Sequence, residues 1–463
     1  MTLVTLIKKQ YWRSREQLKV LFKRACALYL DYGDQIRVLF TFWRLPNSNS
    51  TALKGTGEKR ALFISYYTSP YQSQYGTQRT AKYIKYLSKL GWRATLITTS
   101  PSTTEEDKNA ETLPEEVDII RIDRHEPRAL HGQHQLVPDD FIRWVLPAVE
   151  TAEEILRQQP HSIVYATAPP YSNLLAGAIV AKRAGLPLIS DFRDPWSLID
   201  TGWVVNGIFR RRLNEMLERR ITRISDRVVM ADQKEYWGEY FLDHSNDLHN
   251  KLISITNGFD DDDFTGICET PLKTSHTQFS ISYVGRLYDH ETIYNIIAPL
   301  EIWAKAYPGD IKHVRFVYAG PPPSKYFTDA ITRLGCDLKE HGYVSHRNAI
   351  AIRAHSNIQM FAQPIQFKAH VASGKIYEMI RVGVPIIART RADGAVAKLL
   401  GETKTGYAVP QEDHGEAARL LRMEFNRWRE GNPKPEPDKK RIEKYSRAQL
   451  ANKLDEVFRE IIE

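Results

Sequence analysis

The sequence predicts an α/β protein with two doubly wound domains that face a cleft and a helical extension at the N-terminus. Its 463 residues exceed what one ordinary hydrophobic core accommodates, so two domains are expected. Short apolar runs alternate with amphipathic segments in two separate series, a pattern typical of parallel sheets with right-handed crossovers. The first 60 residues differ from both series in charge and in periodicity.

The positive charge of the chain is concentrated at its N-terminus. Residues 1–60 contain twelve Lys or Arg and four acidic residues, an excess of +8 that equals the net charge of the whole chain. The rest of the chain is therefore neutral, and the pI near 9.1 describes the extension and not a basic catalytic body. Because a nucleic-acid-binding protein usually spreads its basic residues over a folded face, no nucleic-acid partner is expected.

The extension comprises residues 1–54. Apolar residues recur every three or four positions over residues 1–30, which predicts an amphipathic helix, and Gly33-Asp34 is expected to break it. Pro46 to Gly57 has the composition of a linker. A basic amphipathic helix of this kind can bind an anionic membrane surface or a partner helix, or it can pack on the body of the protein. The sequence leaves these three alternatives open.

The chain shows neither a membrane span nor a secretion signal. No run reaches the roughly 18–20 uncharged apolar residues that span a bilayer, and Lys8, Lys9 and Arg13 interrupt the apolar residues at the N-terminus. The three cysteines lie far apart without metal-ligand spacing, as reduced thiols do. We therefore expect a cytoplasmic protein, either free or peripheral on the inner face of the membrane.

The two strand–helix series define the domain boundaries. The first series predicts an N-terminal Rossmann-like domain over residues 55–270, and a polar stretch near Thr274 separates it from a second Rossmann-like domain over residues 271–430. Residues 431–463 contain a Pro-rich stretch and a last helix, which is expected to pack back on the N-terminal domain.

The most informative motif opens a helix of the second domain. Ser373-Gly374-Lys375 follows a predicted strand, and a helix that begins there offers free backbone N–H groups and the positive end of its dipole to a pyrophosphate. Lys375 would add a positive charge, and Glu378, one turn later, could accept hydrogen bonds from two ribose hydroxyls. The alternative is an ordinary amphipathic helix whose Lys and Glu are solvated.

Other segments strengthen this interpretation by their order along the chain. The helix is followed by Gly383-Val384-Pro385, and three further segments stand at matching positions: 257–260 (Asn-Gly-Phe-Asp), 284–287 (Val-Gly-Arg-Leu) and 406–410 (Gly-Tyr-Ala-Val-Pro). Together they resemble the retaining glycosyltransferases of family 4, which have the GT-B fold. In the first domain, 167–170 (Thr-Ala-Pro-Pro) and 191–196 (Asp-Phe-Arg-Asp-Pro-Trp) resemble a bacterial subgroup of these enzymes. The resemblance covers residues 60–460.

The resemblance implies roles for individual residues. It makes the second domain the nucleotide-sugar-binding domain and the first the acceptor-side domain. Glu378 would bind the donor ribose and Arg286 the pyrophosphate. The full set expected at the donor is Arg286, Lys375, Glu378, Gly374, Ser373, Gly76 and His370. Asp191, Arg193 and Asp194 end a strand at the cleft and are the candidate catalytic residues, although an Asp–Arg pair that locks a loop would also account for them.

The chain departs from the family pattern at three positions. His370 stands where an acid usually holds the donor sugar, Glu291 stands where a Lys is common, and the histidine often found after the strand that ends near Thr167 is absent. A reduced activity is compatible with these changes. No metal is expected, because Asp191 and Asp194 lack the Asp-x-Asp spacing, and Arg286, Lys375 and helix N-termini can neutralise the leaving group. No cofactor is expected beyond the nucleotide-sugar, which is a substrate.

The resulting hypothesis is a retaining glycosyltransferase that transfers a sugar from a nucleotide-sugar donor. The acceptor would be a glycan, a lipid-linked molecule or a protein, in glycan or polysaccharide biosynthesis. Two alternatives remain open. One is a catalytically reduced GT-B-type scaffold subunit of a glycan-assembly complex, and the other is a sugar-nucleotide epimerase of the same two-domain form.

Overall fold

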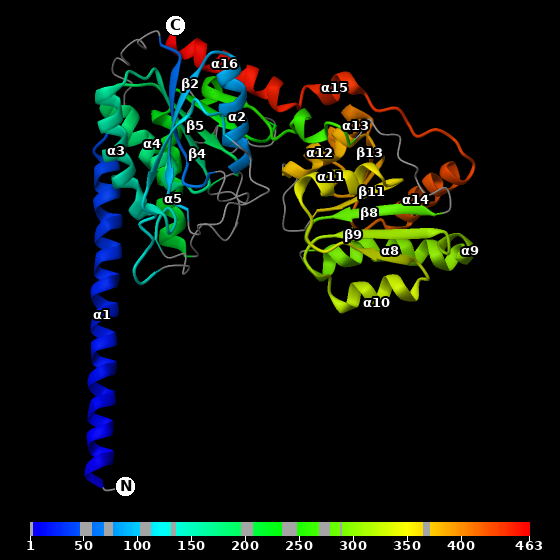
Figure 1. Ribbon diagram of the computed structural model, residues 1–463, viewed down its shortest axis with the longest axis horizontal. Coiled ribbons are helices and arrows are strands. Elements are labelled where there is room, and N and C mark those ends of the chain that lie inside the picture. The colour runs from blue at the N-terminus through cyan, green and yellow to red at the C-terminus, as the bar shows by residue number, and fades with distance from the viewer. Residues whose placement is uncertain are drawn as a thin grey trace. The chain divides into compact units, whose positions relative to one another are not determined.

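The computed structural model describes residues 3–46, 58–68, 77–101, 113–130, 136–194, 196, 207–233, 248–267, 278–287, 289–363 and 371–463, with side chains from residue 19 onward. The chain forms two compact units, coloured along the sequence in Figure 1. Unit 1 comprises residues 1–234, 238–254 and 454–463, and unit 2 comprises residues 235–237 and 255–453.

Unit 1 is built on a seven-stranded parallel sheet with the order β3-β2-β1-β4-β5-β6-β7. Its strands are β1 (Arg60–Ile64), β2 (Arg93–Thr99), β3 (Asp118–Ile122), β4 (Ile163–Ala168), β5 (Leu188–Phe192), β6 (Arg227–Met230) and β7 (Leu252–Ser254). The central strands β4 and β5 are buried along their whole length, as expected for parallel strands covered on both faces.

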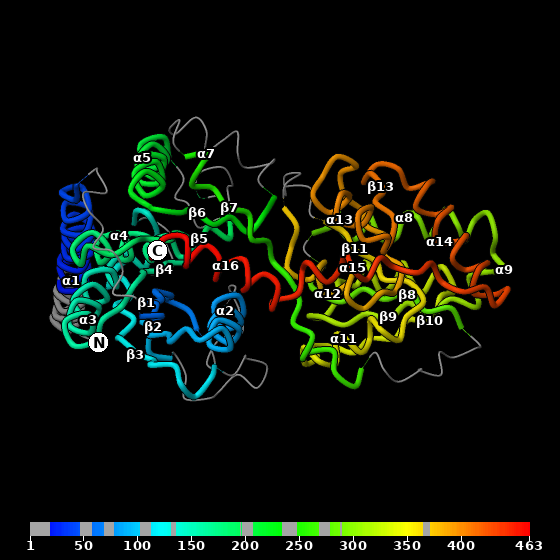
Figure 2. The backbone as a smooth tube through the Cα atoms, turned by 90° about the horizontal axis from the view of Figure 1, so that it is seen from above, coloured from blue at the N-terminus to red at the C-terminus, as the bar shows by residue number. Residues whose placement is uncertain are grey.

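Helices cover both faces of this sheet. They are α2 (Thr77–Lys89), η1 (Ile142–Trp144), α3 (Val145–Gln158), α4 (Ser172–Ala184), α5 (Ile208–Ile224), the short α7 (Leu248–Lys251) and the end of α16 (Arg447–Ile462). In Figure 2, α3 and α4 lie on one side of the sheet, and α2 and α16 lie on the other. On that second side, Phe458 of α16 packs against Trp92 at 4.9 Å between ring centroids, and Asp455 accepts a 2.7 Å hydrogen bond from the Trp92 indole.

The N-terminal extension is one continuous helix, α1 (Leu3–Trp43). The prediction that the helix breaks at Gly33-Asp34 was wrong, because tertiary contacts hold the helix together there. The carboxylate of Asp31 accepts hydrogen bonds from the backbone N–H groups of Arg128, Ala129 and Leu130 at 2.9, 2.8 and 3.2 Å. Asp34 pairs with Arg143 at 2.8 Å. The carboxylates of Asp31 and Asp34 could have bonded to nearby backbone groups and favoured a turn. Here they bind other parts of unit 1 and dock the helix on it.

Unit 2 is built on a six-stranded parallel sheet with the order β10-β9-β8-β11-β12-β13. The strands are β8 (Phe279–Val284), β9 (Val314–Ala319), β10 (Asp337–Glu340), β11 (Ile358–Ala362), β12 (Ile386–Arg389) and β13 (Gly406–Val409). The helical elements are η2 (Asp261–Phe264), α8 (His290–Ala306), α9 (Pro308–Ile311), α10 (Lys325–Arg333), α11 (His346–Ala354), α12 (Gly374–Val382), α13 (Ala395–Thr403), α14 (His414–Arg429) and α15 (Lys439–Glu443).

Two apolar cores enclose the sheet of unit 2. One core, which includes Ile296, Phe327 and Phe425, joins it to α8, α10 and α14. The other, which includes Ile350, Ile376 and Leu399, joins it to α11, α12 and α13. The order of the strands reverses between β8 and β11, and in doubly wound sheets ligands bind beyond the carboxyl ends of the strands at such a point. The prediction of two doubly wound parallel sheets with an N-terminal helix is confirmed.

Across the part of the chain that the structure describes, no helix combines the length and the apolarity needed to cross a bilayer.

Candidate functional site

Two glycine turns form the edge of the unit 2 sheet where the strand order reverses. Gly285 follows β8 with a φ of +136°, a conformation that only glycine adopts without strain. Gly320 follows β9, and a β-carbon there would lie 2.4 Å from the carbonyl oxygen of Gly285. The turns are joined by a 2.9 Å hydrogen bond from the Gly285 N–H to the Ala319 carbonyl. Glycine at position 320 thus lets the two turns approach each other closely at this edge of the sheet.

The N-terminus of α12 carries polar groups without partners in the described structure. Ser373 is the N-cap residue, yet its buried hydroxyl oxygen makes no hydrogen bond to any described residue. A β-carbon on Gly374 would meet no heavy atom within 4 Å, so open space borders the first turn. The first backbone N–H groups of a helix have no intrahelical acceptor. These donors and the helix dipole together favour an anion at this position.

Lys375 is a partly buried cation beside these groups. Its Nζ lies 3.5 Å from the position that a β-carbon on Gly285 would take, and it stands over the rings of Tyr283 and Phe361 at 5.4 and 5.0 Å. No carboxylate of the described residues forms an ion pair with it. Burial, with a further contribution from the positive charge of Arg353, lowers the pKa of Lys375 to about 8. A bound anion would stabilise the charged form.

Glu378 lies one turn further along α12 and is held from both sides. One carboxylate oxygen is 2.8 Å from His346 Nε2, and the other accepts a 2.8 Å hydrogen bond from Arg353 Nη1. Burial would raise the pKa of Glu378, but the bond to His346 and the charge of Arg353 outweigh it and hold that pKa below its usual range. The side chain keeps 17% of its exposure. Since a carboxylate has about four acceptor positions, it can still receive further hydrogen bonds.

His346 and Arg353 were missed by the sequence analysis. They lie seven residues apart on α11, which places them two turns apart on the same side of that helix. The hydrogen bond to Glu378 is the largest influence on His346 and raises its pKa, and Asp263 of η2 adds a weaker attraction. The spacing of seven residues indicates that His346 and Arg353 share one face of α11. Nothing in the sequence indicates that this face meets Glu378.

Arg286 follows Gly285 at the same edge of the sheet. Its backbone carbonyl accepts a 3.0 Å hydrogen bond from the Tyr283 hydroxyl, which holds the turn, while its side chain is exposed. The structure thus brings Arg286, Ser373, Gly374, Lys375 and Glu378 to one edge of unit 2. Gly76 and His370, which were expected to join them, lie outside the described residues.

The three candidate catalytic residues of unit 1 differ in their surroundings. Asp191 in β5 is fully buried and forms two hydrogen bonds with the guanidinium of Arg79, at 2.9 and 3.1 Å, and a third with Thr167 at 2.8 Å. Burial would raise the pKa of Asp191, and Arg79 overcomes this and lowers it. This is the buried Asp–Arg pair that the sequence left open as an alternative. Its carboxylate has no surface to offer a substrate.

Arg193 and Asp194 follow at the end of the same strand. Arg193 donates a 3.0 Å hydrogen bond from Nε to the carbonyl of Ala168 and also contacts the carbonyl of Pro169, which ties the end of β4 to the end of β5. Asp194 is partly buried, and burial raises its pKa although the charge of Arg193 opposes the shift. A carboxyl group with a raised pKa at a strand end is suited to proton transfer or to binding a hydroxyl group.

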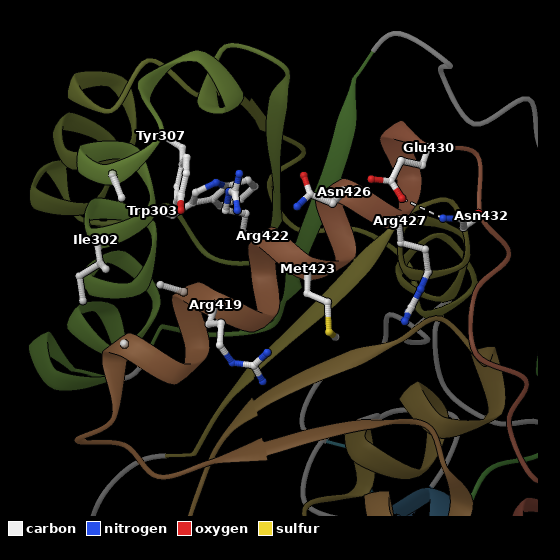
Figure 3. A pocket seen from close by; sticks show the side chains of 13 residues that line it. Ile302, Trp303, Tyr307, Arg419, Arg422, Met423, Asn426, Arg427, Glu430 and Asn432 are labelled. Atoms are coloured by element: carbon white, nitrogen blue, oxygen red, sulfur yellow. Dashed lines mark hydrogen bonds between the residues drawn. The ribbon is translucent and has the colours of Figure 1, made fainter.

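A cavity of about 540 Å³ lies elsewhere in unit 2, between the end of α8 and the length of α14 (Figure 3). Its arginines are already neutralised: Arg419 pairs with Glu416 at 2.6 Å, and Arg422 pairs with Asp310 at 3.3 Å. None of the strand-end residues described above lines it. It is therefore a surface hollow distinct from the candidate site.

Comparison with known proteins gives a family match for part of the chain. Residues 76–236, within unit 1 and the segment that follows it, match the model of the "Glycosyl transferase 4-like domain". A comparison with curated proteins gave no match.

Solved structures resemble most of the chain in fold at low sequence identity. An α,α-trehalose-phosphate synthase (UDP-forming) from Burkholderia xenovorans, in complex with glucose-6-phosphate, has a TM-score of 0.58 and 11% identity, over 86% of this chain and all of that one. WaaG, a glycosyltransferase involved in lipopolysaccharide biosynthesis, has a TM-score of 0.53 and 12% identity, over 86% and 99%. A putative UDP-N-acetylglucosamine 2-epimerase from Listeria monocytogenes has a TM-score of 0.51 and 12% identity, over 86% and 95%.

These matches agree with the two parallel sheets. Residues 76–236 thus match the model of a glycosyltransferase 4-like domain, and the chain has the GT-B fold.

Proposed function

We propose that the protein is a metal-independent retaining glycosyltransferase that transfers a sugar from a nucleotide-sugar donor. The acceptor is a glycan, a lipid-linked molecule or a protein, in glycan or polysaccharide biosynthesis at the inner face of a membrane. Within family 4 it belongs to the bacterial subgroup with the segment 191–196. The observation that carries the proposal is the partly buried Lys375, which forms no ion pair with a carboxylate of the described residues and adjoins the open N-terminus of α12.

The donor diphosphate binds at this helix start. It neutralises Lys375, accepts hydrogen bonds from the backbone N–H groups of Gly374 and its neighbours and from the free hydroxyl of Ser373, and attracts the exposed Arg286. The ribose lies one turn along the helix, where Glu378 accepts its hydroxyls. His346 and Arg353 hold that carboxylate ionised and in place, so they act as positioning residues.

Transfer then proceeds with the charge of the leaving nucleotide stabilised by protein groups. The bond between the anomeric carbon and the phosphate oxygen breaks through an oxocarbenium-like state. The acceptor hydroxyl attacks from the face that the nucleotide leaves, and its proton passes to the departing phosphate oxygen. Lys375, Arg286 and the α12 N–H groups stabilise the developing negative charge without a metal ion.

The acceptor side belongs to unit 1. Asp194, whose pKa is raised by burial, and Arg193 beside it are the proposed groups that contact the acceptor. Asp191 acts through its ion pair with Arg79, which holds the strand end from which both residues project. Gly76 is proposed as a close-approach position near the phosphates.

A panel of nucleoside diphosphates and their sugars, measured by thermal shift and calorimetry on the full-length protein, tests donor binding. Lys375→Met should abolish the stabilisation by the nucleotide, while Lys312→Met, at an exposed lysine of the same unit, should leave it unchanged. If both variants bind like the parent, the donor site lies elsewhere. Product analysis by NMR with candidate acceptors then distinguishes transfer from isomerisation of the donor.

A second candidate function rests on a specific observation. Both oxygens of Glu378 are already bound by His346 and Arg353, and His370 stands where the related enzymes have an acid. A catalytically reduced subunit that binds nucleotide and serves as a scaffold for glycan assembly is compatible with this arrangement. Donor binding with no turnover on any acceptor would favour this alternative.

A further inference from the structure

One side of α1 exposes five large apolar residues, which we call the α1 stripe. Their exposed fractions are 72% for Phe22, 79% for Tyr29, 63% for Ile36, 55% for Phe40 and 37% for Trp43. At about 100° of rotation per residue, the five lie within about 60° of one another around the helix. Such a stripe on a helix indicates a surface that is covered by something else.

The α1 stripe faces away from unit 1 except at Trp43, whose ring centroid lies 5.0 Å from the guanidinium carbon of Arg220 in α5. The other residues of α1 that contact the body include Asp31, Gln35, Val38 and Phe42, and they lie on another side of the helix. Gln35 accepts a 2.7 Å hydrogen bond from the backbone of Val137, and Val38 and Phe42 are fully buried. The sequence left packing on the body open as one of three alternatives. Such packing accounts for one side of α1 and leaves the stripe uncovered except at Trp43.

The spacing of apolar residues along α1 fits a flat partner better than another helix. Phe22, Tyr29, Ile36 and Trp43 are seven residues apart, as in a coiled coil, but the same spacing continued toward the N-terminus reaches Arg15 and Lys8.

A different recurrence persists through the whole helix. Apolar residues recur at a spacing of eighteen. The pairs are Val4 and Phe22, Tyr11 and Tyr29, Leu18 and Ile36, and Phe22 and Phe40. Eighteen residues make about five turns of a straight α-helix. The apolar line therefore runs parallel to the axis of an uncoiled helix, whereas a coiled-coil seam requires supercoiling.

Basic residues border the α1 stripe on one side. Lys19, Lys23, Arg37 and Arg44 all lie within about 100° of its edge and are exposed. The guanidinium of Arg44 stands 4.1 Å above the ring of Phe40, so charge and apolar surface are joined. Of the two acids in the described part of α1, Asp31 binds the body, and Asp34 pairs both with Arg143 of the body and with Arg37 of the border. The exposed side of the helix thus complements a negatively charged surface.

We infer that α1 lies flat on an anionic membrane, with the α1 stripe in the boundary between headgroups and acyl chains and the basic border at the lipid phosphates. The inference rests on the membrane association of the proposed function and names anionic lipid as the surface that α1 binds. It does not depend on whether the protein transfers a sugar. Aromatic and aliphatic side chains supply the insertion, and lysines and arginines supply the attraction to anionic lipid. Unit 1, to which the acceptor is assigned, is thereby held at the membrane, as a lipid-linked acceptor requires.

Co-sedimentation of the full-length protein with vesicles tests the inference. Ile36→Glu and Val20→Glu form a matched pair, because both replace an aliphatic side chain that is 63% exposed on the same helix and both add one negative charge. Ile36 lies in the α1 stripe, and Val20 lies on the opposite side of the helix.

We expect the parent to bind vesicles of phosphatidylcholine and phosphatidylglycerol and to bind pure phosphatidylcholine at least about tenfold more weakly. Ile36→Glu should weaken binding to the anionic vesicles by about tenfold or more, and Val20→Glu should weaken it much less. Circular dichroism and thermal unfolding of both variants should match the parent, because both side chains are exposed.

Three results would overturn the inference: a parent that stays in the supernatant, equal losses in the two variants, or a lipid-free dimer that Ile36→Glu alone dissociates. The last result would assign the α1 stripe to a second copy of the chain. Thermal stabilisation by nucleotide, measured on the same samples, separates failure of this inference from failure of the proposed donor site.

Discussion

His346 Nε2 lies 2.8 Å from a carboxylate oxygen of Glu378, and this contact joins the first residue of α11 to the fifth residue of α12. Arg353 binds the other oxygen from the same helix. The carboxylate at the proposed ribose position is therefore fixed before any ligand binds. Preorganised acceptors of this kind bind without a further ordering cost.

The His346–Glu378 contact predicts a pH dependence of stability. The pKa of His346 is raised in the folded state, so its contribution is fully present below the unfolded pKa near 6.5 and is lost as the pH rises through the raised value. The parent should lose about 1 kcal/mol of unfolding free energy more than His346→Gln between pH 6 and pH 8. Urea unfolding at the two pH values measures this difference, and equal losses would contradict the assignment.

The same contact responds in the opposite direction at acidic pH. The pKa of Glu378 is lowered in the folded state, so its contribution is present above the unfolded pKa near 4.5 and is lost as the pH falls through the lowered value. Glu378→Gln should therefore show a weaker dependence of stability on pH below pH 5 than the parent. It should also bind nucleotide more weakly than the parent, whereas it should bind pyrophosphate equally well, because the ribose contact alone is changed.

Lys375→Met should raise the stability of the protein and weaken its affinity for nucleoside diphosphates. Burial disfavours the charged ammonium, so its removal should raise the unfolding free energy at pH 7 by up to about 3 kcal/mol, given a pKa of about 8 against 10.5. Affinity for nucleoside diphosphates should fall by about tenfold to hundredfold. In the parent, that affinity should decline as the pH rises above 8. A destabilised variant with unchanged affinity would assign Lys375 a purely structural role.

Gly320→Ala should disturb the turn that shapes the site. The added β-carbon would lie 2.4 Å from the Gly285 carbonyl oxygen and 2.8 Å from the Tyr318 hydroxyl, and backbone must move to relieve the first contact. We expect a loss of about 2–3 kcal/mol of unfolding free energy and weaker nucleotide binding. Gly309→Ala is the control, because a β-carbon there meets nothing within 4 Å. Equal effects in the two variants would show that the close approach of Gly320 and Gly285 is unimportant.

Asp191 and Asp194 should respond differently to the same isosteric change. Asp191→Asn removes one partner of a buried ion pair and leaves Arg79 uncompensated, so it should cost about 3–5 kcal/mol of unfolding free energy. Asp194→Asn replaces a carboxylate whose charged form is disfavoured by burial, so stability should be unchanged or slightly higher. Under the proposed function, Asp194→Asn should reduce transfer while nucleotide binding persists. Chemical unfolding and a transfer assay report the two effects separately.

Much of the architecture follows from local pattern. Buried runs such as Ile163–Ala168 alternate with amphipathic helices, and this periodicity predicted both doubly wound sheets. The motif around Ser373, Lys375 and Glu378 was recognisable for the same reason, since its residues are neighbours in the chain and the function of a helix start depends on local backbone geometry.

Contacts between distant segments were beyond the reach of the sequence. Arg79 and Asp191 are 112 residues apart, and from the sequence either could line a site. The fold places them together in a buried ion pair that solvent does not reach. The helix break expected at Gly33-Asp34 failed for a related reason. The preference of Asp for turns is real, but three backbone N–H groups of residues 128–130 bind Asp31 and anchor the helix through that position.

The sequence by itself determined the two α/β sheets, the basic N-terminal helix and the helix that starts at Gly374, because each depends on periodicity or on the backbone of adjacent residues. Only the tertiary structure decided that His346 and Arg353 hold Glu378, that Asp191 is sealed in an ion pair, and which side of α1 is left exposed. These features arise where separate elements meet. Burial and the local electrostatic environment are set there by packing, which no single segment of the sequence contains.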